Sequence, residues 1–71
     1  MIFHTRITNA EKLEIYERVM VDAHKLLLER LLIKGIDPET FDKNSTTEFA
    51  EIDEVTAKIK SIETKIQELL N

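Results

Sequence analysis

The feature that most constrains this chain is a regular series of apolar residues near its end. The series steps alternately by three and four positions: Ile52, Val55, Ile59, Ile62, Ile66 and Leu69. This is the heptad spacing of a helix that buries one narrow apolar seam against another helix. The sequence therefore predicts a long helix that needs a helical partner, and the rest of the chain must supply that partner or leave the seam exposed.

The first helix is bounded by clear local signals. Thr8 and Glu11 stand at the spacing of a capping box, in which each side chain accepts from the backbone N–H of the other residue. Gly35 is the only glycine, and it follows an apolar run at a point where helices commonly end in a left-handed residue. Pro38 cannot continue a helix. These signals predict a helix over 9–34.

A second capping box starts the second helix. Ser45 and Glu48 have the required spacing, and acidic residues follow in the first turns, where they complement the positive end of the helix dipole. The predicted helix spans 46–70 and is nearly as long as the first. We therefore expect an all-α fold, an antiparallel helical hairpin that forms a single domain over 1–71, with an N-terminal arm at 1–7 and an interhelical loop at 36–44.

The first helix is more apolar than one partner helix can cover. At 100° per residue its apolar side chains span an arc of about 160°, and Val21, Leu28 and Leu32 extend the apolar surface further. Exposed apolar surface of this kind marks a protein interface, so we expect two hairpins to dimerise into a four-helix bundle. The predicted interface residues are Tyr16, Met20, Ala23, Leu27, Leu28 and Leu31.

Composition limits the other possibilities. With 71 residues the chain has one small core, and without cysteine it has no disulfide to stabilise that core. Oligomerisation is another common way to stabilise so small a protein. No apolar run exceeds three residues, far fewer than the roughly 20 that cross a bilayer. A net charge of −4 disfavours binding to a nucleic-acid backbone. We expect a cytoplasmic protein with no membrane partner and no cofactor.

Three glutamates are the strongest candidates for chemistry. Glu48, Glu51 and Glu54 recur at three-residue spacing, which places carboxylates on one helix face, where they can hold a hard cation such as Mg²⁺. The pattern resembles the helix-borne glutamate pairs of all-α nucleotide pyrophosphohydrolases, which implies metal-dependent hydrolysis, although the downstream Glu-x-x-Asp partner of that family is missing. The simpler interpretation is that these acids offset the helix dipole.

The sequence as a whole favours a non-enzymatic protein that acts by contact, as an adaptor, inhibitor or regulator. Its predicted partner is a second copy of itself, with another protein as the alternative. Two other functions stay open: the metal-dependent hydrolase, and an accessory protein associated with nucleic acid. His24 lies at the edge of the apolar arc, and Val21 stands where a Glu-x-x-His metal motif needs glutamate, so we interpret His24 as a packed or interface residue.

Overall fold

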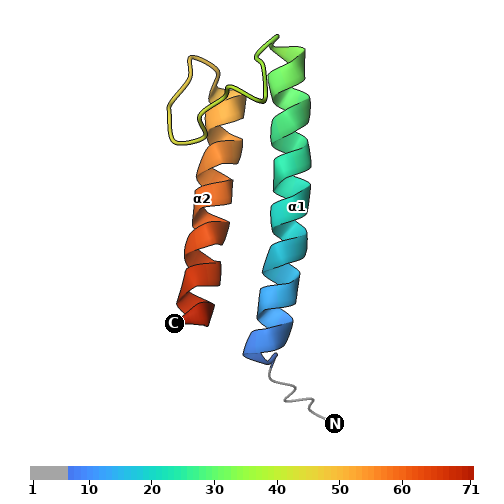
Figure 1. The fold of residues 1–71 in the computed structure, drawn as a ribbon, viewed down its shortest axis with the longest axis vertical. Helices are drawn as coiled ribbons and strands as arrows, with labels where there is room; N and C mark the ends of the chain where they lie inside the picture. Colours follow the sequence, from blue (N-terminus) through green and yellow to red (C-terminus); the bar gives the residue numbers. More distant parts are fainter. Residues whose placement is uncertain (1–6) are drawn as a thin grey trace.

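A computed structural model describes residues 7–71 of the chain. Within this range it contains two helices and no strand, α1 (Asn9–Ile33) and α2 (Ala50–Leu70). The two helices run antiparallel and side by side, joined by a folded loop at one end (Figure 1). The predicted all-α helical hairpin is therefore confirmed. Of the arm predicted at 1–7, only Ile7 falls inside the described residues.

The start of α1 follows the predicted capping box. The Thr8 hydroxyl accepts a hydrogen bond of 3.1 Å from the backbone N–H of Glu11, and the Glu11 carboxylate accepts one of 3.3 Å from the backbone N–H of Thr8. Two backbone donors that α1 leaves without an intrahelical partner are satisfied in this way.

The end of α1 follows the predicted glycine stop. Gly35 has φ 73°, in the left-handed region. Its N–H donates to the Leu32 carbonyl at 3.1 Å, and the N–H of Ile36 donates to the Leu31 carbonyl at 2.9 Å. This pair of bonds is the Schellman motif, which turns the chain away from the helix and brings Ile36 back onto the core.

Replacing Gly35 by alanine is expected to lower the free energy of unfolding by about 1 kcal/mol, because a left-handed backbone is unfavourable for residues with a Cβ. A Cβ at this position meets no atom within 4 Å, so the loss is conformational and not steric. Gly35→Asn is the control and should lose less, since asparagine tolerates this backbone region better. Urea unfolding of the three proteins measures both effects, and an alanine variant as stable as the parent would contradict the assignment.

The start of α2 differs from the prediction: the helix begins at Ala50, not at residue 46. Ser45 does not cap it, because Asp42 holds Ser45 in a local turn through its carbonyl at 3.0 Å and its carboxylate at 3.2 Å. Such local hydrogen bonds compete with helix formation. The backbone N–H of Thr47 instead donates a hydrogen bond of 2.8 Å to the Asp53 carboxylate. Phe49 is the N-cap of α2 and has an extended backbone conformation.

The core lies along the contact between the two helices. Of the described residues, seven apolar side chains are buried in it: Ala23, Leu27, Leu31, Ile52, Val55, Ile59 and Ile62. Ile52 and Ile59 are completely inaccessible to solvent, and Ile66 and Leu69 continue the same seam half-buried toward the open end. The heptad seam of α2 therefore finds its partner in α1 of the same chain. Thr56 is the one buried polar residue among residues 7–71, and its hydroxyl donates to the Asp53 carbonyl at 3.0 Å.

Candidate interaction surface

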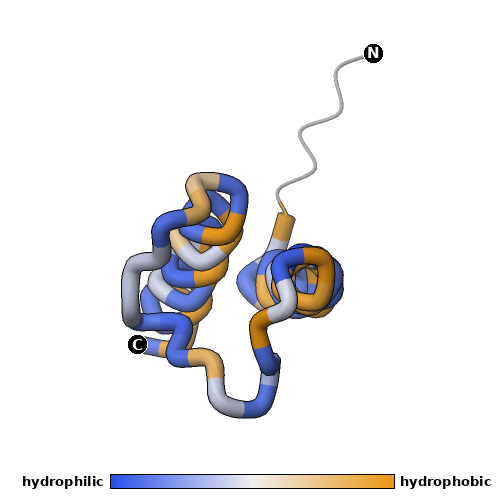
Figure 2. Tube along the Cα trace, turned by 90° about the horizontal axis from the view of Figure 1, so that it is seen from above, coloured by the Kyte–Doolittle hydropathy of each residue, from blue (hydrophilic) through white to orange (hydrophobic). Residues whose placement is uncertain are grey.

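Three large apolar side chains of α1 face away from α2. Val21 is 52% exposed, Leu28 45% and Leu32 61%. At 100° per residue they lie within about 40° of one another, and about 140° around the helix from Ala23 and Leu27, which face α2. Figure 2 looks along the helices and shows apolar segments of α1 on the side turned away from α2. We call Val21, Leu28 and Leu32 the outer stripe.

The predicted interface residues divide between this surface and the core. Ala23, Leu27 and Leu31 are buried by α2 of the same chain, so they are not accessible to a second copy of the hairpin. Tyr16 and Met20 are half-buried and pack against the same core. Leu28 alone belongs to the outer stripe. The involvement of the exposed and half-buried members in a dimer stays a prediction.

A shallow groove of about 410 Å³ adjoins the outer stripe. One wall is α1, which contributes His24 and Leu28, and the other is the interhelical loop, which contributes Pro38 and Phe41. Phe41 folds back onto the hairpin core. Leu28 lines the groove and also belongs to the outer stripe, so the two adjoin, but Asp42, Lys43 and Asn44 give the loop side of the groove a polar lining.

The closed end of the hairpin is held by opposite charges on the two helices. Lys34 lies 2.7 Å from Glu51, measured from Nζ to Oε1, and 4.9 Å from the centroid of the Phe49 ring. Arg30 donates to the Glu51 carbonyl and lies 3.8 Å from the Glu54 carboxylate. Basic groups at the end of α1 and acidic groups at the start of α2 also complement both helix dipoles. The sequence indicated the dipole role of these acids but not their pairing across the hairpin.

The hydrogen bond from Lys34 holds the pKa of Glu51 below the ordinary value of a glutamate. A carboxyl group with a lowered folded-state pKa stabilises the fold above its unfolded pKa, about 4.3 for glutamate, and this contribution is lost as the pH falls through the lowered value. We therefore expect Glu51→Gln to be less stable than the parent at pH 7, with the difference becoming smaller as the pH is lowered toward 3.

Urea unfolding at both pH values measures this difference. Glu54→Gln is the matched control, because Glu54 is 80% exposed and lies farther from its basic partner, and its effect should be smaller at pH 7. A Glu51→Gln difference that is the same at pH 3 and pH 7 would contradict the role of the ion pair.

The three candidate metal ligands are not brought together as predicted. Glu48 precedes α2, because the helix begins only at Ala50, so the three-residue spacing does not continue along one helix face. Glu51 and Glu54 face Lys34 and Arg30 instead. Among the described residues, the structure forms no group of three or more His, Asp or Glu side chains able to hold a metal ion.

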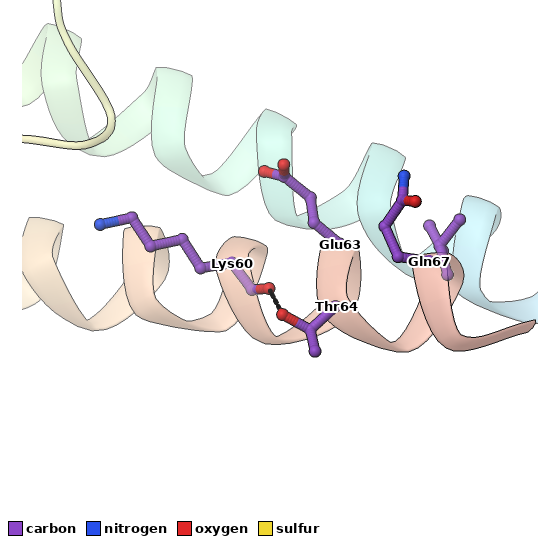
Figure 3. Close-up of a pocket in the computed structure, with 5 residues that line it drawn as sticks. Lys60, Glu63, Thr64 and Gln67 are labelled. Atoms are coloured by element: carbon purple, nitrogen blue, oxygen red, sulfur yellow. Dashed lines mark hydrogen bonds between the residues drawn. The ribbon is translucent and has the colours of Figure 1, made fainter. Parts of the chain in front are cut away.

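A second surface hollow, of about 460 Å³, lies on α2 (Figure 3). All the residues that line it come from this one helix: Lys60, Glu63, Thr64, Ile66 and Gln67. The Thr64 hydroxyl donates to the Lys60 carbonyl at 3.0 Å, and the Glu63 carboxylate lies 2.9 Å from Nζ of Lys43 in the loop. Two polar side chains of this hollow, Glu63 and Thr64, thus have partners within the chain.

The outer stripe groups three of the seven large apolar side chains that are exposed among residues 7–71; the other four, Ile7, Ile15, Ile33 and Leu70, do not belong to it. Neither helix in the described part of the chain has a segment long and apolar enough to cross a membrane. Comparison of the chain with family models, curated proteins and solved structures found no match.

Proposed function

We propose that this protein is a non-enzymatic helical interaction module that works as a homodimer through the outer face of α1. The observation that carries the proposal is the outer stripe, where three large apolar side chains stand 45–61% exposed on one helix face. A module of this kind acts as an adaptor, inhibitor or regulator through protein–protein contact. A chain without cysteine suits a reducing compartment, and we propose the cytoplasm as its location.

Burial of the outer stripe against a second copy supplies the driving force. Removing the exposed half of a leucine side chain from water contributes about 1 kcal/mol, and a two-fold symmetric interface uses each residue twice. Two hairpins joined through the outer face of α1 form an assembly of four helices, in which a second apolar contact, α1 against α1, is added to the cores of the two hairpins. A short chain without disulfides gains stability from such an assembly.

The thermal midpoint of the protein is expected to rise by several degrees when its concentration is raised a hundredfold. The reason is mass action, since about 2.7 kcal/mol of stabilisation accompanies a hundredfold change in the concentration of a binding partner. Thermal unfolding followed by circular dichroism, at protein concentrations that span this hundredfold range, measures the shift. A midpoint that does not depend on concentration would overturn the homodimer.

A further inference from the structure

Four charged residues follow one side of the outer stripe. They alternate in sign along α1: Arg18, Asp22, Lys25 and Glu29. At 100° per residue all four lie on the same side, about 40–100° around the helix from the centre of the stripe. They therefore form one edge of the proposed interface, which we call the charged edge.

We infer that the second copy docks antiparallel on the outer stripe, with the two-fold axis near His24. This inference rests on the proposed homodimer. A two-fold axis that makes two helices antiparallel brings the charged edge of one copy against the same edge of the other in reverse order. Arg18 then faces Glu29 of the partner subunit, and Asp22 faces Lys25 of the partner subunit, each pair occurring twice. Each of the four charged side chains therefore lies opposite a side chain of the other sign.

A parallel arrangement lacks this complementarity. Its two-fold axis runs along the helices, so the charged edge of one copy lies beside the opposite flank of the partner's stripe, and the four charges do not meet one another. The apolar side chains agree with the antiparallel arrangement, since the same axis places Val21 beside the partner's Leu28. Residues 21 and 28 lie about equally far from residue 24, on either side of the axis.

Three of the four residues of the charged edge have no ion-pair partner among residues 7–71. Among the ion pairs between described residues, Arg18 takes part in one, at 3.6 Å from Glu14, with both side chains more than 70% exposed. An exposed pair of this kind contributes little. Asp22, Lys25 and Glu29 take part in no ion pair within the described part of the chain. The charges are thus available to a second copy.

Disulfide trapping tests the orientation directly, because the chain has no cysteine of its own. Val21→Cys and Leu28→Cys are prepared separately, mixed under reducing conditions so that subunits exchange, and then oxidised. A disulfide needs Cα atoms about 4.4–6.8 Å apart. In the antiparallel dimer the two copies of residue 21 are roughly 8–10 Å apart along the helix axis, and those of residue 28 roughly 10–14 Å.

The expected result is a cross-linked dimer in the mixture and little in either variant alone. Cross-linking of each variant with itself would show a parallel dimer and overturn the inference. If no combination cross-links while the parent protein sediments as a dimer, the dimer uses another face, so the inference fails and self-association stands. If the parent sediments as a monomer, the proposed function fails with it.

Charge reversal tests the register. Arg18 and Glu29 are eleven residues apart on one helix, about 16 Å along its axis, so they cannot pair within a chain and any coupling between them is intermolecular. Arg18→Glu and Glu29→Arg should each weaken the dimer about tenfold, and the double variant should recover most of that loss. Sedimentation equilibrium gives the dissociation constants, and losses that simply add in the double variant would contradict the register.

Discussion

Replacing Ile59 by alanine is expected to lower the free energy of unfolding by about 2–5 kcal/mol. Ile59 is completely buried between α1 and α2, so the variant loses both the burial of the side chain and its packing contacts. A domain of this length has roughly 4–11 kcal/mol of stability in total, so the change removes a large share of it. Urea unfolding at one fixed protein concentration measures the loss, because association also contributes to stability.

Ile33→Ala is the matched control for this core substitution. It removes the same atoms from α1, but the Ile33 side chain is 79% exposed, so the expected change stays within about 0.5 kcal/mol. Equal losses from Ile59→Ala and Ile33→Ala would contradict the assignment of the seam as the core of the hairpin.

Leu28→Asp is expected to dissociate the dimer without unfolding the hairpin. The substitution puts a charge in the middle of the apolar interface, which is unfavourable without a partner group. In the single hairpin the Leu28 side chain is nearly half exposed, so an aspartate there remains hydrated and the fold tolerates it. We expect the mass in solution to fall to the 8.3 kDa of one chain, with the helical circular dichroism retained at low temperature.

Ile33→Asp separates this effect from a general effect of adding charge to α1. At 100° per residue, Ile33 lies about 100° away from Leu32 around the helix and is outside the outer stripe. Ile33→Asp should therefore remain dimeric. If both aspartate variants dissociate, or if neither does, the outer stripe is not the interface.

The hairpin itself was predictable because its signals are local. Thr8 with Glu11, and Gly35 with its left-handed backbone, fix the two ends of α1 through neighbouring residues alone. The start of α2 was predicted four residues too early. Ser45 fits a capping box in sequence, but it has a competing partner in Asp42, three residues before it. A sequence pattern does not show which of two local partners a side chain chooses.

The sequence predicted which helix carries the candidate interface, but not which face of that helix forms it. Periodicity showed that α1 has more apolar surface than one helix covers, and the structure bears this out at Val21, Leu28 and Leu32. It did not show which part of the wide apolar arc α2 covers. Leu27 and Leu31 were predicted at the dimer interface but lie in the core of the hairpin. The position of α2 around α1 depends on tertiary packing and on the path of the loop.

The cross-hairpin charge pairs were missed for the same reason. Arg30 and Lys34 are separated in sequence from Glu51 and Glu54 by the whole interhelical loop, and only the folded hairpin brings them together. The acidic cluster that suggested a metal site is explained by these pairs and by the late start of α2. The only related prediction from the sequence was that these acids offset the helix dipole.

The role proposed for the outer face of α1 requires that two copies of this chain associate. Sedimentation equilibrium of the unmodified protein tests this association most directly, in neutral buffer from micromolar to millimolar concentration. We predict a mass that approaches twice the 8.3 kDa of one chain as the concentration rises. A folded protein that keeps the mass of a single chain over the whole range would contradict the account.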